Sequence, residues 1–281
     1  MKEGEVTRTI RRVRRVLDEG KYDEALRTLL HLGEKYPEAG EIRPEIAQVL
    51  LRRGKSRLGK GKVKEGRADV EHSLDWAVLP EAMVQLARVL TQEGNLERAH
   101  EVLTKVLEID DTYGPVHEAL GYLFSRWADH RESARAFEQA LSLGHATPEL
   151  FLAVWSAYMA VEKLDRAHEL LLDGVERFPE NDRLHAAAGD SCVYAKGDSE
   201  TAEPYWRKAI ELNPKNFSAL FSLAGLGASR GRRTESMELL RRCVALDPEK
   251  TRARWREDLE SPLGRFSEFA RDPEFRSLLG G

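Results

Sequence analysis

The chain has 281 residues, of which 33% are charged and 7% aromatic, a composition typical of a water-soluble, helix-rich protein. The formal net charge of −4 gives no overall case for nucleic-acid binding, and no run approaches eighteen apolar residues, so no membrane-spanning helix is expected. Two cysteines, Cys192 and Cys243, do not make a disulfide framework, and the N-terminus lacks the apolar run of a signal peptide. We therefore expect a reduced, cytoplasmic protein.

Seven similar stretches follow one another, and each has the pattern of two amphipathic helices around a short turn. Apolar residues recur within them at spacings of three and four, which places them on one side of a helix. In chain order the stretches are 6–39, 47–79, 80–113, 114–147, 148–182, 183–216 and 217–250, with an insert at 40–46. From the second stretch on, the starts lie 33 to 35 residues apart, and so regular a period indicates a repeat architecture.

The stretch 114–147 shows the pattern most clearly. Gly121 and Ser133 are small residues at places where the two helices must approach closely, and Phe137 is expected to fill the space beside them. Such a hairpin alone would leave its apolar face in water. We therefore expect each hairpin to stack between copies of itself.

Prolines and capping residues mark the expected helix ends. Pro214 and Pro248 follow second helices, because a proline disfavours α geometry in the residue before it. Asn95 and Asp198 are expected to cap second helices by accepting backbone N–H bonds. Pro204 is expected in the first turn of its helix, where a missing donor is tolerated.

This pattern resembles the tetratricopeptide repeat family over about residues 6–250. The matching residues are Ala99, Leu120, Gly121, Phe137, Ala167, Ala202, Trp206, Ala209, Pro214 and Pro248. The chain departs from the family pattern in its Gly- and Lys-rich second stretch and at Ser133 and Ser236, where alanine is usual. The resemblance implies an all-α solenoid, a right-handed superhelix of about seven helix-turn-helix repeats whose first helices line an inner groove. Residues 251–281 do not repeat, and we expect them to cap the last hairpin.

The implied groove can be read from the repeat positions that face inward. In the first four stretches these positions carry a basic row with one aromatic neighbour: Arg14, Lys55, Arg88, Arg126 and, beside them, Tyr122. In the last three they carry Leu152, Met159, Leu184, Tyr194 and Phe221. We expect a groove that is basic toward the N-terminus and apolar toward the C-terminus, which suits a partner segment with acidic and apolar residues. The alternative is a solvated basic face and an apolar row that packs on neighbouring turns.

No catalytic, metal or cofactor site is predicted. Residues 54–61 approach a phosphate-binding loop, but Gly61 stands where Ser or Thr is needed and the preceding residues belong to a helix pattern. The eight histidines never fall four residues apart, and the acidic residues are scattered over helix faces. Cys192 and Cys243 are expected to face the core. The asparagines with which some tetratricopeptide proteins clamp chaperone tails are absent from the first helices.

The expected function is therefore non-catalytic: a scaffold or adaptor that binds another protein. The alternative is a regulatory subunit that contacts nucleic acid or an anionic membrane surface through its basic N-terminal end. Residues 1–79 hold 18 Lys/Arg against 14 Asp/Glu, whereas the remainder holds 26 against 34. No aromatic residues interleave with the densest basic cluster, 52–67, which disfavours binding of single strands. We do not expect nucleic acid or a membrane as the main partner.

Overall fold

The computed structural model describes residues 2–261, 264–269 and 271–279. Within these residues the protein is all-α, with sixteen α-helices, one short 3-10 helix and no strand. The chain forms two compact units, unit 1 (Met1–His145) and unit 2 (Ala146–Gly281). The predicted architecture of paired, repeated helices is confirmed.

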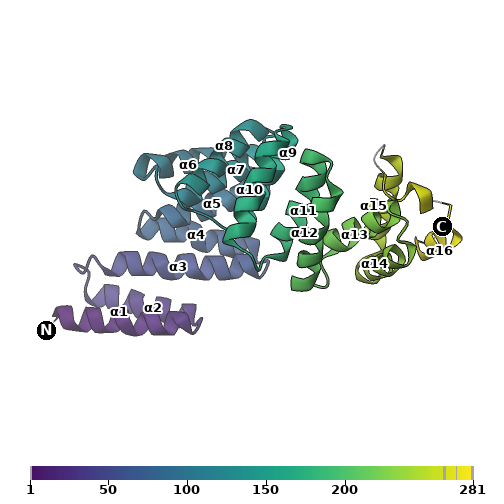
Figure 1. The fold of residues 1–281 in the computed structure, drawn as a ribbon. Coiled ribbons are helices and arrows are strands. Elements are labelled where there is room, and N and C mark those ends of the chain that lie inside the picture. Colours follow the sequence, from purple (N-terminus) through teal and green to yellow (C-terminus); the bar gives the residue numbers. More distant parts are fainter. Residues whose placement is uncertain (1, 262–263, 270, 280–281) are drawn as a thin grey trace. The chain divides into compact units, whose positions relative to one another are not determined.

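Unit 1 consists of four consecutive helical hairpins, each an odd-numbered helix followed by its even-numbered partner (Figure 1). We call the odd-numbered helices first helices and the even-numbered ones second helices. The helices are α1 (Lys2–Asp18), α2 (Tyr22–Lys35), α3 (Ile42–Gly59), α4 (Val63–Trp76), α5 (Pro80–Glu93), α6 (Leu96–Ile109), α7 (Gly114–Arg126) and α8 (His130–Ser142).

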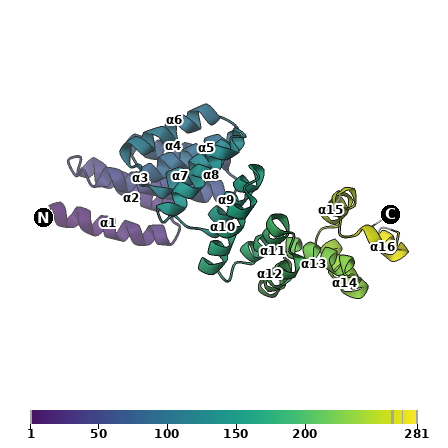
Figure 2. The ribbon, with the colours of Figure 1, turned by 45° about the horizontal axis from the view of Figure 1, so that its top comes forward.

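Unit 2 continues the pattern with three hairpins and a closing segment, and Figure 2 shows α11 with α12 and α13 with α14 as neighbouring pairs. The segment after α15 is called the C-terminal segment. The elements are α9 (Pro148–Ala160), α10 (Leu164–Arg177), α11 (Asp182–Lys196), α12 (Ser199–Leu212), α13 (Phe217–Ser229), α14 (Arg233–Leu246), α15 (Pro248–Glu260), η1 (Ser267–Phe269) and α16 (Pro273–Leu279).

Small residues allow the two helices of a hairpin to approach, as the sequence predicts. A Cβ atom at Gly121 would lie 2.3 Å from the Phe137 ring, so only glycine fits where that ring crosses α7. Ser133 is fully buried, and its hydroxyl donates to the carbonyl of Gly121 at 2.8 Å. Gly189 has the same relation to Trp206 in unit 2, with 2.5 Å between the added Cβ and the indole nitrogen. These contacts fix the register of each hairpin.

The segment expected as an insert, 40–46, largely belongs to a helix. Residues 42–46 form the first turns of α3, which is 18 residues long. Ile42 and Ile46 explain the difference, because both are buried in the core of unit 1 at 2% and 1% exposure. The apolar face of α3 therefore begins one turn earlier than the repeat period indicates.

The helix ends agree with the sequence in part. Asp198 caps α12, accepting from the backbone N–H groups of Glu200 and Thr201 at 2.9 and 3.0 Å. Asn95 makes no side-chain cap at α6, so that prediction is wrong. Pro204 lies inside α12 rather than in its first turn.

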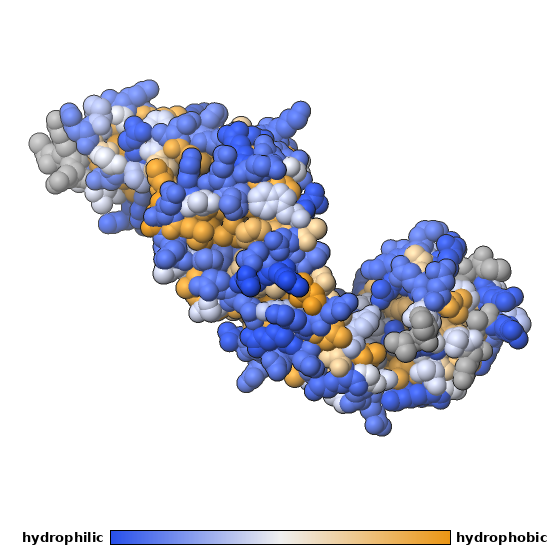
Figure 3. All heavy atoms as spheres, turned by 90° about the horizontal axis from the view of Figure 1, so that it is seen from above, coloured by the Kyte–Doolittle hydropathy of each residue, from blue (hydrophilic) through white to orange (hydrophobic). Residues whose placement is uncertain are grey.

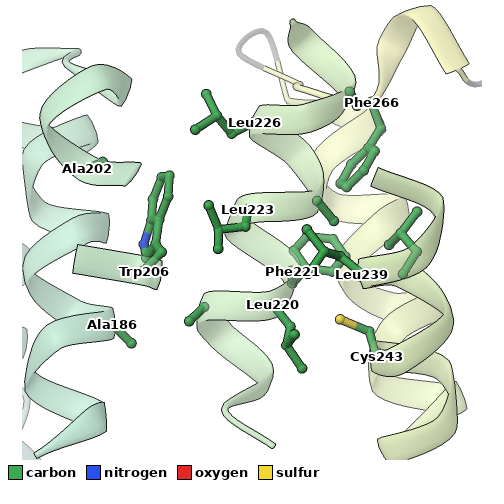
Figure 4. Close-up of a cluster of buried hydrophobic side chains, with 14 of the residues drawn as sticks. Ala186, Ala202, Trp206, Leu220, Phe221, Leu223, Leu226, Leu239, Cys243 and Phe266 are labelled. Carbon is green, nitrogen blue, oxygen red and sulfur yellow. The ribbon is translucent and has the colours of Figure 1, made fainter. Parts of the chain in front are cut away.

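The two cysteines are buried core residues, as expected. Cys192 and Cys243 are 1% and 0% exposed, and Figure 4 shows Cys243 among the apolar side chains of unit 2. Burial raises the pKa of the Cys243 thiol to about 12 and also raises that of Cys192. Both thiols therefore stay protonated at neutral pH, and neither can act as a thiolate nucleophile.

The surface is mainly polar. The face drawn in Figure 3 is largely hydrophilic, with apolar residues in bands between charged ones. Among the described helices, none combines the length and the apolar character needed to cross a bilayer.

The stability of unit 2 is expected to depend on pH through the carboxylate of Glu203. Glu203, 16% exposed, accepts from Arg232 at 3.1 and 3.2 Å, from Arg207 at 2.5 Å and from Arg230 at 2.7 Å. Arg232 and Arg207 hold the pKa of Glu203 at about 2, against an ordinary 4.5. The ionised carboxylate thus stabilises the fold above about pH 4.5, and this stabilisation is lost as the pH falls toward 2.

We expect Glu203→Gln to lower the free energy of unfolding by about 2 kcal/mol at pH 7, after allowance for solvent screening. Urea unfolding of both proteins at pH 7, 4 and 2 measures this difference. It should shrink toward zero at pH 2. A difference that does not change with pH would show that the arginines do not act through the charge of Glu203.

Candidate functional site

All four residues of the predicted basic row lie on the first helices of unit 1, and three of them pair with an acid. Arg14, Lys55 and Arg88 have side chains that are 65%, 48% and 37% exposed. Each pairs with a carboxylate on the next first helix: Arg14 with Glu45 on α3, Lys55 with Glu81 on α5 at 2.8 Å, and Arg88 with Glu118 on α7. The basic row is thus one side of a ladder of ion pairs between successive hairpins.

The acids of this ladder are functional candidates that the sequence analysis missed. Glu45, Glu81 and Glu118 all lie near the start of their helices, and each is 26 to 31 residues after its cation. A search for acids one repeat downstream of each basic position would have found them. Their presence means that a ligand meets alternating charges on unit 1 rather than a purely basic surface.

Arg126 and Tyr122 lie further along the chain, on α7. Arg126 is exposed and has no ion pair within the part of the chain that the structure describes. Tyr122 is 38% exposed, and its ring packs edge-on against Phe137 with 5.0 Å between the ring centres. Tyr122 therefore presents a fixed aromatic edge on the same helix as an unpaired guanidinium group.

Arg88 belongs to the most densely connected part of the row. Glu118 is 8% exposed and is shared between Arg88 and His145, whose Nε2 lies 3.0 Å from the carboxylate. The Nε of Arg88 is buried and has no hydrogen-bond partner among the described residues. Burial, reinforced by the charge of Glu81, raises the pKa of nearby Tyr113. Arg88 is therefore held within the framework of unit 1, and its buried Nε is closed to an outside acceptor.

A shallow hollow of about 430 Å³ lies between α1 and α3, at the start of the basic row. Its lining consists of Arg14, Leu17, Asp18, Glu45, Gln48 and Arg52. The hollow combines both charges with one apolar side chain, and it is open to solvent. Such a surface fits a polar chain segment rather than an enclosed small molecule.

The predicted apolar row in unit 2 is exposed only in part. Leu152 and Met159 on α9 are partly buried, and Tyr194 on α11 is 57% exposed. Leu184 is fully buried, so its place in a groove is wrong. α11 packs against both α10 and α12, and Leu184 is enclosed in that packing rather than open to a groove.

Phe221 is also buried, at 2% exposure, but for a different reason. Its ring is covered by Phe266 of the C-terminal segment, with 5.3 Å between the ring centres. The repeat pattern predicted that Phe221 faces the groove. It did not predict the cover, because Phe266 lies C-terminal to the repeats. Phe221 is therefore corrected from an open binding residue to one held by the chain itself.

Asp190 is a polar centre between α11, α12 and α13. Its carboxylate accepts from Trp206 Nε1 at 3.0 Å, Ser222 Oγ at 2.9 Å and Ser218 Oγ at 3.2 Å. Burial raises the pKa of Asp190, while these three bonds and the charge of Arg265 act in the opposite direction. The site holds a carboxylate with a fixed orientation and shows no nucleophile beside a base.

The arginines of the basic cluster at 52–67 are bound to acids of unit 1. Asp69, 2% exposed, accepts from Arg53 at 2.7 and 2.9 Å and from Arg57 at 2.7 Å. Arg67 pairs with Glu71 at 3.0 Å and with a second acid, Glu93, at 2.6 Å. Within the described ranges, no group of three His, Cys, Asp or Glu residues could hold a metal ion. The cluster is therefore mainly part of the framework.

Comparison with known proteins gives family matches on both units. Models described as tetratricopeptide repeat match residues 80–113 and 193–250. The type IV pilus assembly protein PilF of Pseudomonas aeruginosa is 24% identical over 148 residues, 52% of this chain and 58% of PilF. The chain therefore matches little more than half of the length of that relative.

Two solved structures show the same fold. One is YrrB, described as a TPR protein with an unusual peptide-binding site, which is 20% identical, covers 60% of this chain and 86% of its own, and has a TM-score of 0.50. The other is the C-terminal part of a TPR repeat-containing protein from Cytophaga hutchinsonii. It is 17% identical, covers 86% of this chain and 97% of its own, and has a TM-score of 0.61.

Proposed function

Because the chain is a tetratricopeptide repeat protein, we propose that it holds a segment of another protein against the basic row of unit 1. Proteins of this family mediate protein–protein interactions and are typically non-catalytic. The proposed role is that of a scaffold or adaptor. The proposed partner segment carries acidic residues for unit 1. Leu152, Met159 and Tyr194 of unit 2 are proposed separately as contacts for apolar residues of a partner.

The observation that carries this proposal is the exposed, exchangeable state of the basic row. Lys55 and Glu81 are both about half exposed, and ion pairs in such a setting are worth at most about 1 kcal/mol. A carboxylate of a partner can therefore replace the internal acid at little cost. Arg126 is exposed and has no ion pair within the described residues. Guanidinium groups bind carboxylates through two parallel hydrogen bonds, which favours arginine at such positions.

The structure gives less support to contact with nucleic acid or an anionic membrane. Arg53, Arg57 and Arg67 in the cluster at 52–67 are bound to acids of unit 1. A site for phosphates would need these cations to be free. The proposed compartment is the cytoplasm, because two buried, unpaired cysteines suit a reducing environment.

The proposal is tested by selecting random twelve-residue peptides on the full chain and measuring the affinity of the best binders by calorimetry. We expect the selected peptides to be enriched in Asp and Glu and to contain apolar residues. The double variant Arg88→Glu/Arg126→Glu should bind them at least tenfold more weakly, because two cations become like charges for the peptide. Added salt should weaken the wild-type complex as well.

The matched control reverses two exposed arginines on second helices, Arg98→Glu/Arg131→Glu. This variant has the same net charge as the test variant and should keep the wild-type affinity within about twofold. Equal losses of peptide affinity in both variants would show that the effect comes from the overall charge of the protein. Unchanged affinity in the Arg88/Arg126 variant would reject the basic row as the binding surface.

A further inference from the structure

The C-terminal segment places two adjacent side chains, Arg265 and Phe266, on one face of α13. Phe266 is fully buried, and its backbone N–H donates to Asp258 Oδ2 at 3.0 Å. Its ring meets Phe221 at 61°, and Figure 4 shows it at the side of α13 away from Trp206. Phe266 therefore fills the place that an aromatic anchor of a partner would take on an open α13.

Arg265 lies in a space that the absence of a side chain creates. A Cβ atom at Gly225 would be 3.0 Å from Arg265 Nε and 3.3 Å from its Cβ, so a larger residue would fit only if the arginine side chain shifted by a few tenths of an ångström. Arg265 Nη1 donates to the carbonyl of Ser222 at 3.4 Å, and its Nε is 3.8 Å from Asp258 Oδ1. The guanidinium carbon is 5.8 Å from the centre of the Trp206 ring. A carbonyl, a carboxylate and an aromatic ring thus surround one cation.

The other acid of this site comes from a different hairpin. Asp190 on α11 reaches Ser218 and Ser222, which share the Gly225 face of α13 at spacings of four and three residues. The charge of Arg265 favours the ionised form of Asp190, whereas burial raises the pKa of that carboxyl. The face therefore offers an acidic and aromatic environment whose chemistry is opposite to that of the basic row in unit 1.

α13 is buried along most of its length, in contrast to the exposed Tyr194 on the neighbouring first helix α11. Ten consecutive residues of α13, 219–228, are buried, whereas Tyr194 on α11 is 57% exposed. The hairpin partner accounts for one side of α13, since Ser236 on α14 donates to the carbonyl of Ala224 at 2.8 Å. Arg265 and Phe266 cover another side of α13. The burial of α13 thus depends on a segment that is not part of any hairpin.

We propose that this face of α13, with Asp190, Ser222, Gly225 and Phe221, is a binding site for a partner segment that carries an arginine followed by an aromatic residue, and that Arg265 and Phe266 are its resident occupants. The inference rests on the proposed function only in treating the chain as a protein-binding module. The two sites lie in different units and select opposite charges, so they can fail separately.

The C-terminal segment is held by buried rings and, at its outer end, by exposed ion pairs. Phe275 is fully buried, and its ring stacks on that of Phe269 with 4.9 Å between the ring centres. Arg233 pairs with Asp272 at 2.8 Å and with Glu274 at 2.6 Å, and Arg241 pairs with Glu274 at 2.7 Å. Both arginine side chains and that of Glu274 are 44–51% exposed, and pairs of this kind contribute little to stability. A tethered segment competes at an effective concentration of about millimolar. The site is therefore masked in the wild-type chain and becomes available when the resident side chains are removed.

The test uses a fluorescent peptide with the sequence of residues 261–276 and follows its anisotropy as full-length protein is added. The chain with Arg265→Ala/Phe266→Ala should bind this peptide at least tenfold more tightly than wild type does, because the internal competitor is gone. Adding Asp190→Asn to that variant should weaken its affinity for the peptide at least fivefold. Asp165→Asn, a matched change of an exposed acid on α10, should not. A peptide with alanine at the two resident positions should not bind.

Three results would overturn the proposal: equal binding by both chains, no binding by either, or no effect of Asp190→Asn. Phe266→Ala alone empties the place of the resident ring and should still bind the peptide several-fold more tightly than wild type, so it is the second variant if the double variant fails to fold. Light scattering on the wild-type chain tests a different occupant. A dimer that Phe266→Ala abolishes would assign the face to the segment of a second copy and reject a foreign partner. Arg88→Glu/Arg126→Glu should leave binding of this peptide unchanged, which separates this site from that of unit 1.

Discussion

Replacing Phe137 by alanine is expected to lower the free energy of unfolding of unit 1 by about 3–5 kcal/mol. Phe137 is 2% exposed and lies directly on Gly121, which has no side chain to refill the space. Tyr122 loses its packing partner as well. Urea unfolding followed by circular dichroism measures the loss. Phe137→Leu, which keeps most of the volume, should cost clearly less.

The effect of Phe137→Ala should spread beyond its own hairpin. Each hairpin of a repeat protein buries its face on its neighbours, so α5 and α6 lose support when the α7–α8 pair loosens. Hydrogen exchange should therefore accelerate in α5 and α6 as well as in α7 and α8. Exchange confined to α8 would contradict the linkage, and a loss of stability below about 1 kcal/mol would contradict the packing.

Replacing Trp206 by alanine is the second large expected effect, also about 3–5 kcal/mol, in unit 2. Trp206 is 1% exposed, its ring occupies the space left by Gly189, and Figure 4 shows it between the helices of two hairpins. Its indole nitrogen also donates to Asp190 at 3.0 Å. The variant therefore removes both a large buried surface and a donor to a buried carboxylate.

Trp206→Phe separates these two contributions. The phenyl ring keeps most of the contact, whereas Asp190 retains only the donors Ser218 and Ser222. We expect a cost of about 1–2 kcal/mol for the lost hydrogen bond and reduced packing. Thermal and urea unfolding of the three proteins provide the comparison. Equal costs for the phenylalanine and alanine variants would show that the hydrogen bond, rather than the buried ring, governs stability here.

The fold could be predicted because its determinants are local and recur. Each hairpin needs a small residue opposite a large one, as in Gly121 with Phe137 and Gly189 with Trp206, and the period of about 34 residues makes such pairs visible. The period does not show a change of helix length. Leu184 on α11 is fully buried although its repeat position is one expected to face inward, and the 18-residue α3 begins at Ile42 because its apolar face extends.

Only part of the candidate site could be predicted from the sequence. The cations of the basic row stand at repeated positions, but their acids depend on how successive hairpins stack, as Arg88 with Glu118 illustrates. The cover over Phe221 comes from Phe266, which lies outside the repeats and follows no period. Contacts of this kind join residues about 30 to 45 positions apart and require the three-dimensional arrangement.

If the first helices of unit 1 carry the binding surface, hydrogen exchange of the full chain should change when a saturating selected acidic peptide is added. Exchange should slow in α3, α5 and α7, which carry Lys55, Arg88 and Arg126, with no change in the second helices α4, α6 and α8. Protection of the second helices alone, or protection that persists in Arg88→Glu/Arg126→Glu, would contradict this assignment of the binding surface.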